Sequence, residues 1–315
     1  MEQKTIHTIA CLGTGVMGHG VAFLAAKAGY EARLFGRSPE SIERGLASIA
    51  RAAALYEANA LLAAGAGETI LTRIKGVTNL EEAAADADLV MESVAENLDV
   101  KRQVFARVEA VCREDTIFAT DTSGLDINAI AAALKRPQRF LAVHFFTPPY
   151  LMPTVEICPS AHTLASVCQA AVDWVESIGN RPIILEKFVP GFLINRIQTA
   201  VLREAAHIVA CGWASPETVD AAVVLSLGRR YSETGPLESA DMGGWDILGS
   251  LLDGLGKELS AAGEAPDFVK KLIAAGELGL KSGQGLYSWS PERIEERRSA
   301  REKSLIRFLR ADMGK

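Results

Sequence analysis

The chain of 315 residues is long enough for two domains, or for one large domain with a substantial core. Hydrophobic residues make up 49% of it and charged residues 23%, the balance of an ordinary globular protein. The net charge of −6 gives no general attraction for nucleic acid or membrane surfaces, so we expect neither as a partner. An anionic ligand would need a local basic patch.

The five cysteines are scattered, without a CxxC pair or a neighbouring histidine cluster, so we predict no metal site. Cys11 and Cys158 lie in apolar, strand-like runs, which favours buried, reduced side chains and a reducing compartment. The opening residues "MEQKTIHTIACLG" run into a strand without a signal peptide, and no apolar run has the length of a membrane span. We therefore expect a cytoplasmic protein.

The first half of the chain alternates short apolar runs with helical patterns, which predicts an α/β fold with a doubly wound, mostly parallel sheet. Helices are expected over Gly18–Ala28 and Pro39–Ala63. The expected strands are Thr8–Leu12, Glu31–Phe35, Leu89–Val94, Thr116–Thr120, Leu141–Phe146, Thr154–Cys158 and Pro182–Leu185. Only the Pro-rich segment "TPPYLMP" separates the fifth and sixth of these strands, which predicts a hairpin-like reversal instead of a crossover.

After "FVPGF" the pattern becomes helical throughout. Apolar residues recur at helical spacing from Gly191 to Cys211, and Ser215 in "ASPET" is typical of a helix N-cap. We therefore place a domain boundary near Val189, with residues 1–188 as one domain and residues 189–315 as an all-helical domain. The charged tail from Pro291 is expected to be a solvated helix.

The stretch "IACLGTGVMGHGVAFLAAKAG" has glycines in G-x-G-x-x-G spacing, directly after a strand and at the start of a helix. This context indicates a Rossmann-type dinucleotide site, with a glycine-rich turn that binds no ligand as the alternative. His19, just past the last glycine, is expected to face solvent, with a phosphate contact as the alternative. The residues expected at the cofactor here are Gly13, Gly15, Val16, Met17 and Gly18.

The stretch "ARLFGRSPE" lies at the end of the second strand, where NAD-binding proteins carry an acid for the ribose hydroxyls. Gly36 removes that acid, and Arg37 adds a planar, permanent charge suited to phosphate. Ser38 is expected to cap the next helix, whose start also favours a nearby anion. We therefore predict NADP as the cofactor, with NAD as the other possibility; alternatively, Arg37 pairs with Glu40 or Glu43 at the surface.

Two further stretches are "FATDTSGLDINAIA" (118–131) and "FLAVHFFTPPYLMPTVEI" (140–157). Together with "GTGVMGHG", "AENLDVK", "PGFLINR", "TGPLESADMGG" and "GLKSGQGLYSWSPE", they appear in the order seen in one enzyme family. The chain resembles the 3-hydroxyacyl-CoA dehydrogenases, as in short-chain 3-hydroxybutyryl-CoA dehydrogenases, over nearly its whole length. The resemblance implies hydride transfer between NAD(P) and a small-molecule acyl-CoA substrate, in a homodimer formed through the helical domain.

The resemblance places the catalytic histidine at His144 and its acidic partner at Glu156. Removing a hydroxyl proton requires a base, and a histidine ordinarily titrates near neutrality. A carboxylate on the other ring nitrogen fixes the tautomer and stabilises the charged ring. The predicted chain reversal brings these two residues side by side; by periodicity alone, His144 would be an ordinary strand histidine.

The resemblance also gives Ser123 a hydrogen bond to the reacting oxygen and Asn195 a role in positioning the substrate. The alternatives are that Ser123 caps a helix and that Asn195 is an interior helix residue. Glu96 and Lys101 resemble the residues that contact the nicotinamide-side ribose, although the two could form an ordinary helix salt bridge.

Three positions depart from the family pattern: Asp121 and Thr147 replace asparagines, and Gly124 replaces a common serine. They affect the substrate more than the type of reaction. Relatives with this architecture oxidise free hydroxy compounds such as carnitine or sugar acids, so a thioester is not required; Arg51 and Lys101 are the basic candidates for a CoA handle. A different class is a non-catalytic nucleotide-binding protein, as in some lens crystallins, which the intact catalytic residues disfavour.

Overall fold

The computed structural model describes residues 6–314. The chain forms two compact units, one made of the described residues up to Asn195 together with those from Ala300 onward, and one made of Arg196–Ser299. The predicted boundary near Val189 and a helical domain reaching the end of the chain differ from this division, because the last residues return to the first unit.

The first unit is built on one sheet with the strand order β3-β2-β1-β4-β5-β6-β7-β8. Neighbouring strands are parallel except for the antiparallel pair β6 and β7. This confirms the predicted fold class and the reversal at "TPPYLMP". The strands are β1 (Thr8–Leu12), β2 (Glu31–Phe35), β3 (Ile74–Val77), β4 (Leu89–Glu92), β5 (Ile117–Thr120), β6 (Phe140–Phe145), β7 (Thr154–Pro159) and β8 (Arg181–Ile184).

The seven predicted strands lie within two residues of those observed, but β3 was not predicted. It is short and contains a lysine and a glycine, so its local signal is weak. Its pairing with β2 sets its place at the sheet edge. The helix expected over Pro39–Ala63 ends at Ala58.

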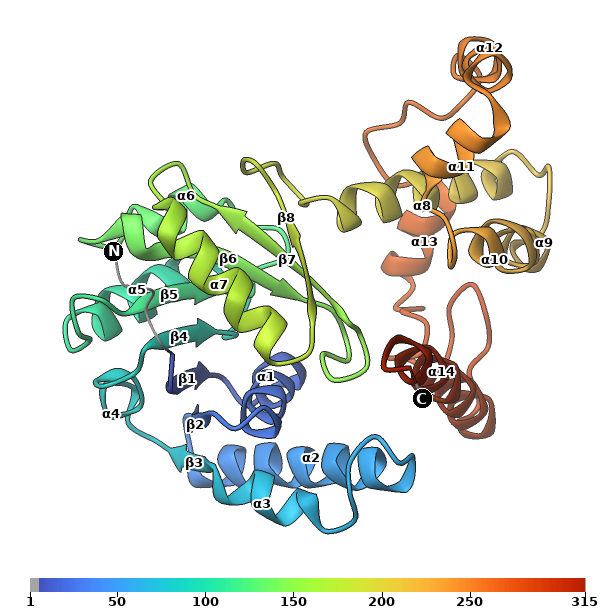
Figure 1. The fold of residues 1–315 in the computed structure, drawn as a ribbon. Coiled ribbons are helices and arrows are strands. Elements are labelled where there is room, and N and C mark those ends of the chain that lie inside the picture. Colours follow the sequence, from blue (N-terminus) through green and yellow to red (C-terminus); the bar gives the residue numbers. More distant parts are fainter. Residues whose placement is uncertain (1–5, 315) are drawn as a thin grey trace. The chain divides into compact units, whose positions relative to one another are not determined.

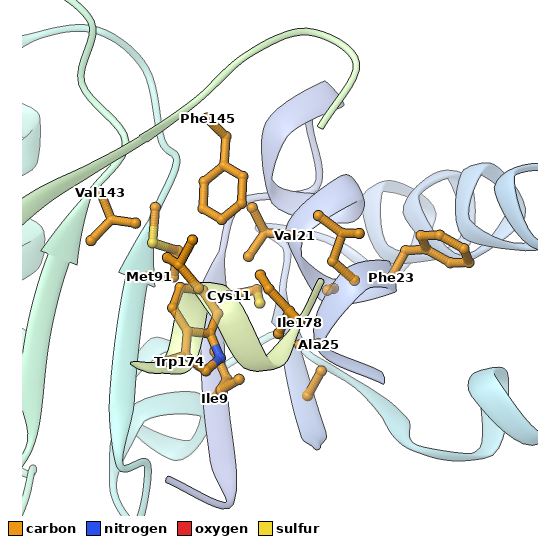
Figure 2. Close-up of a cluster of buried hydrophobic side chains, with 14 of the residues drawn as sticks. Ile9, Cys11, Val21, Phe23, Ala25, Met91, Val143, Phe145, Trp174 and Ile178 are labelled. Carbon is orange, nitrogen blue, oxygen red and sulfur yellow. The ribbon is translucent and has the colours of Figure 1, made fainter. Parts of the chain in front are cut away.

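Helices cover the sheet in two layers, each with its own core (Figure 1). Side chains alternate along β1: Ile9 and Cys11 enter one core, and Ala10 and Leu12 the other. Figure 2 shows the first core, where Phe145 and Trp174 meet edge to face with ring centroids 6.2 Å apart. The helices of this unit are α1 (Val16–Lys27), α2 (Pro39–Ala58), α3 (Ala66–Thr72), α4 (Leu80–Ala84), α5 (Leu98–Glu109), α6 (Ile127–Ala131), α7 (Ala165–Ser177) and the short 3-10 turn η1 (Pro137–Arg139).

The last helix, α14 (Pro291–Asp312), is more than the predicted solvated tail. Ile306 is buried in the first core, and Leu305 and Leu309 pack against it. Arg310 Nε donates to the carbonyl of Asn59 at 3.0 Å. The end of the chain is therefore fixed to the first unit.

The second unit is helical (yellow to red in Figure 1). The divisions between the units fall inside α8 and α14. Within the described residues, no helix combines the length and apolar character needed to span a membrane. The remaining helices are α8 (Ile194–Ala210), α9 (Pro216–Ala222), the π-helical turn η2 (Val223–Leu227), α10 (Gly228–Arg230), α11 (Pro236–Gly243), α12 (Trp245–Leu255) and α13 (Asp267–Ala274).

Candidate active site

The glycines between β1 and α1 form a close-packed loop with one open position. A Cβ at Gly13 would lie 2.6 Å from the Ser93 carbonyl oxygen, and one at Gly18 would lie 2.0 Å from the Gly13 carbonyl oxygen. At Gly15, by contrast, a Cβ would meet nothing within 4 Å. The fold thus requires two of the glycines, and the third leaves its backbone open to a ligand at the helix start. This arrangement fits a pyrophosphate group.

A cavity of about 580 Å³ opens beside this loop. Arg37, Arg44 and Arg107 line it, and no carboxylate is among its lining residues. Val16 is half exposed next to the loop, and Met17 Sδ accepts a hydrogen bond from the Thr147 hydroxyl at 3.4 Å. The other lining residues are Gly13, Thr14, Gly15, Phe35, Gly36, Ser41, Leu80, Ser93, Val94, Ala95, Val100 and Val104.

At the end of β2, the missing acid has a steric explanation. A Cβ at Gly36 would lie 2.5 Å from Ser41 Oγ, 2.8 Å from Ile42 Cγ1 and 2.9 Å from Thr14 Cγ2. Any larger residue at position 36 would have to displace these neighbours. Ser38 caps α2 as predicted, because its hydroxyl oxygen accepts the Ser41 N–H and the Ser41 hydroxyl oxygen accepts the Ser38 N–H.

The expectation that His19 faces solvent is wrong. Its side chain is 8% exposed, and burial lowers its pKa. The sequence places His19 in a helix, but it does not show which side of that helix packs inward. The segment "GHGVAFLAA" is apolar on almost every side, so no polar face marks the surface.

His144 and Glu156 meet as predicted. They face each other across the antiparallel strands β6 and β7, and His144 Nδ1 lies 2.9 Å from Glu156 Oε2. His144 is 5% exposed and Glu156 is fully buried. The rings of Phe146 and Phe192 lie 4.5 and 5.6 Å from the imidazole, between centroids. The pair is therefore enclosed by apolar rings.

The second oxygen of Glu156 binds the start of α8. Glu156 Oε1 accepts the N–H groups of Leu193 and Ile194, each at 2.9 Å. Burial alone raises the pKa of Glu156, but the hydrogen bonds from His144 and these two amides lower it below its ordinary value. Just before them, Gly191 and Phe192 have φ of 78° and 49°. A positive φ is costly for a bulky residue such as Phe192. With this backbone conformation, the N–H groups of Leu193 and Ile194 point at the Glu156 carboxylate.

Ser123 and Asn195 lie together. Asn195 Nδ2 donates to the Ser123 carbonyl oxygen at 3.2 Å, and the Ser123 N–H donates to Glu96 Oε1 at 3.1 Å. Ser123 does not cap α6, because the Asp126 side chain does so. Its exposed position is thus not explained by helix capping.

Glu96 and Lys101 form no ordinary surface salt bridge. Lys101 is 1% exposed, and its Nζ lies 2.7 Å from Glu92 Oε1 and 3.3 Å from Glu96 Oε2. Its burial between two glutamates leaves Lys101 unavailable to a CoA handle, and Arg51 stays exposed. Burial raises the pKa of Glu96, and hydrogen bonds from Thr122 with the charge of Lys101 bring it below its ordinary value.

Sequence reasoning missed Glu92, which also accepts a hydrogen bond from the Thr120 hydroxyl at 2.6 Å. An acid at the end of an apolar strand, nine residues before a lysine, was the available signal. Arg44 was missed as well, although helical spacing from Ser41 places it on the same side of α2.

Asp121, which follows β5, accepts the Phe145 N–H at 2.7 Å. Burial raises its pKa well above the ordinary value, with further contributions from Glu92 and Glu96; the Phe145 N–H and Lys101 act in the opposite direction. Its surroundings therefore disfavour the negative charge that an aspartate adds in place of the family's asparagine.

Comparison with known proteins agrees with this geometry. Residues 8–188 match the profile of the 3-hydroxyacyl-CoA dehydrogenase NAD binding domain, and residues 191–289 match that family's C-terminal domain. The chain belongs to the 3-hydroxyacyl-CoA dehydrogenase family. It is accordingly an oxidoreductase with a dinucleotide-binding domain of the NAD type.

Relatives in this family carry different substrate names. The chain is 31% identical to 5-formyl-3-hydroxy-2-methylpyridine 4-carboxylate 5-dehydrogenase of Mesorhizobium japonicum, over 98% of this chain and 99% of the relative. It is 35% identical to L-carnitine dehydrogenase of Streptomyces griseus (98% and 90%) and 33% identical to 3-hydroxybutyryl-CoA dehydrogenase of Bradyrhizobium diazoefficiens (90% and 96%). A solved structure of a 5-formyl-3-hydroxy-2-methylpyridine 4-carboxylic acid 5-dehydrogenase, described as an NAD+ dependent dismutase, aligns with a TM-score of 0.91 over 99% of this chain and 100% of that one.

The glycine loop gives a prediction with a built-in control. Gly18→Ala should lower the free energy of unfolding by about 1–3 kcal/mol, because its Cβ would overlap the Gly13 carbonyl. Gly15→Ala should fold normally, since φ −65° and ψ −177° suit alanine, but should bind NADH and NADPH more weakly. Denaturant unfolding and fluorescence titration measure the two effects. Equal destabilisation by both substitutions would contradict this assignment.

Asp121→Asn tests the disfavoured negative charge. Because the folded pKa of Asp121 is raised, its stabilising contribution is complete below the unfolded pKa near 3.8 and is lost as pH rises toward the folded pKa. The asparagine protein should therefore match the parent near pH 4 and become progressively more stable than it above that pH. Melting temperatures measured from pH 4 to 8 give the comparison; a constant difference would count against a raised pKa.

Proposed function

We propose that this chain interconverts a secondary alcohol and a ketone, with His144 as the acid/base. The observation that carries this proposal is the 2.9 Å contact of His144 Nδ1 with the buried Glu156. Because Glu156 accepts a hydrogen bond from Nδ1, the Nε2 atom is the one that exchanges a proton with substrate.

In the oxidative direction, His144 Nε2 takes the hydroxyl proton and Glu156 stabilises the charged ring. In the reductive direction the same nitrogen returns the proton to the alkoxide oxygen. The bound nicotinamide dinucleotide supplies or accepts the hydride. Ser123 and Asn195 hold the substrate oxygens, and the hydrogen bond between them fixes their separation. The rings of Phe146 and Phe192 keep water from the imidazole.

We also propose NADP as the preferred cofactor. Gly36 gives the adenosine ribose no acid, and Arg37 lines the cavity where an added phosphate would lie. Ser38 follows Arg37 in the chain and caps the start of α2. Glu96 is proposed to bind the nicotinamide-side ribose, and the buried Lys101 to position the Glu96 carboxylate for it.

For the substrate, the first candidate is a 3-hydroxyacyl-CoA of the 3-hydroxybutyryl or acetoacetyl type, as expected from the family and from the Bradyrhizobium relative. The free hydroxy acid is the second candidate, and the C-terminal helix favours it. The family's C-terminal profile ends at residue 289, before α14. The alignments with the pyridine-carboxylate and carnitine enzymes cover 98% of the chain, so they include most of that helix.

We propose that the helical second unit, Arg196–Ser299, binds substrate and forms the interface of a homodimer. Large apolar side chains are exposed on the second unit, which supports a partner surface of the same chemistry. Among them are Leu202, Leu237, Met242, Ile247 and Leu252.

His144→Ala should lower kcat by about 10²–10⁴-fold while leaving dinucleotide affinity within about twofold, because the imidazole acts on substrate and lies outside the cofactor cavity. Steady-state kinetics and NADPH titration measure the two quantities. The matched control is His162→Ala, a histidine on the turn after β7 that contacts neither site. Turnover that survives His144→Ala would reject the assigned role.

A substrate panel separates the two candidates. With a thioester substrate, kcat/KM for oxidation of 3-hydroxybutyryl-CoA should exceed that for oxidation of free 3-hydroxybutyrate and of carnitine by at least about 10²-fold, because the CoA part contributes binding energy in the transition state. A free hydroxy acid substrate predicts the opposite order. Both cofactors should be used, since equal kcat/KM with NAD and NADP would contradict the proposed cofactor preference.

A further inference from the structure

Arg44 reaches the cofactor cavity from the second turn of α2. The helix begins after Ser38, and its residues Ser41 and Arg44 both line the cavity together with Arg37. The helix is held close to the glycine loop, because a Cβ at Gly45 would lie only 3.2 Å from Thr14 Cβ. A short distance from α2 to the loop is therefore built into the packing, and Arg44 is carried on a rigid element.

The charged residues that line the cavity are all arginines. Arg107 is neutralised by Glu81, with Nη2 2.8 Å from Oε1. Arg37 and Arg44 form no salt bridge within residues 6–314. Glu40, one turn before Arg44, does not line the cavity; hydrogen bonding with Ser38, assisted by the charge of Arg44, lowers its pKa. Arg37 and Arg44 thus both line a cavity whose lining residues include no acid.

We propose that Arg44 is a second specificity-determining residue, which binds the 2′-phosphate of NADP together with Arg37. This inference rests on the proposed cofactor preference. Gly36, directly after β2, stands where a Rossmann fold meets the adenosine ribose, and it lines the cavity together with Arg44. The pyrophosphate belongs instead at the open backbone of Gly15, which lines another part of the same cavity.

Two arginines suit this phosphate better than one. A phosphate monoester offers three oxygens, and each guanidinium can donate two parallel hydrogen bonds. A ribose with free hydroxyls offers neither that charge nor that geometry. Arg44 therefore contributes to NADP binding and little to NAD binding.

The test measures binding directly. Isothermal titration calorimetry with 2′,5′-ADP and with 5′-AMP isolates the 2′-phosphate, and NADPH and NADH titrations give the values for whole cofactors. Arg44→Ala should raise the Kd for 2′,5′-ADP by about tenfold and change that for 5′-AMP by less than about twofold. Arg37→Ala should act in the same way. The double variant should raise the Kd for 2′,5′-ADP by less than the product of the two single-variant fold-changes. Arg102→Ala, an exposed arginine of α5 outside the cavity, controls for net charge.

Each outcome has a distinct meaning. If Arg37→Ala weakens 2′,5′-ADP and Arg44→Ala does not, the role of Arg44 is rejected and the cofactor preference stands. If the parent protein binds 5′-AMP as tightly as 2′,5′-ADP, the preference itself fails. Equal weakening of both nucleotides by Arg44→Ala rejects a 2′-phosphate contact. Melting temperatures confirm that each variant is folded, and Arg44→Lys should restore part of the affinity.

Discussion

Both carboxylate oxygens of Glu156 accept hydrogen bonds, and the positions of His144 and of the start of α8 depend on them. One oxygen accepts from His144 on the neighbouring strand, and the other accepts the amides of Leu193 and Ile194 at the start of α8. The carboxylate therefore fixes the imidazole and the first turn of α8 with a single buried charge. Asn195 follows directly in that turn, so the position of its amide against Ser123 depends on the same carboxylate. Removing Glu156 would leave His144 and the helix start without partners at once.

A second charge cluster connects β4, α5 and the loop after β5. Glu92 at the end of β4 holds Lys101, and Lys101 also contacts Glu96. Glu96 in turn accepts hydrogen bonds from Thr122 and Ser123 on the loop after β5. Hydrogen bonds and the Lys101–Glu96 ion pair therefore connect β4 to Ser123, the residue that contacts Asn195. The loop after β5 is tied in this way to both β4 and α5.

The sequence alone predicts the secondary structure and the chain reversal that this arrangement needs. Period-2 and period-3.6 patterns located most strands and helices, and the proline-rich turn indicated the reversal that brings His144 to Glu156. Contacts between segments far apart in the chain could not be predicted from the sequence in the same way. Lys101 lies in an ordinary amphipathic helix, and only the packed sheet shows that it is buried. β3 owes its existence to its pairing with β2, and the amides that bind Glu156 depend on a positive φ at Phe192, which no propensity predicts. The burial of His19 likewise depends on which side of α1 meets the sheet.

The strand order separates the chemistry from the choice of cofactor. β2, which ends at Phe35 just before Gly36, is separated from β6 by β1, β4 and β5. A change at the end of β2 can therefore replace a ribose-binding acid with arginines without moving the hydrogen bonds around His144. The steric limit at Gly36 makes such a change hard to reverse, since Ser41, Ile42 and Thr14 already occupy the space that an acid needs. Asp121, by contrast, directly follows β5 and accepts the Phe145 N–H, and the charges of Glu92, Glu96 and Lys101 all act on the pKa of its carboxyl. Under the proposed assignments, a substitution of Asp121 would act on both the His144 side and the Glu96 side, whereas a substitution just after β2 would act on cofactor binding alone.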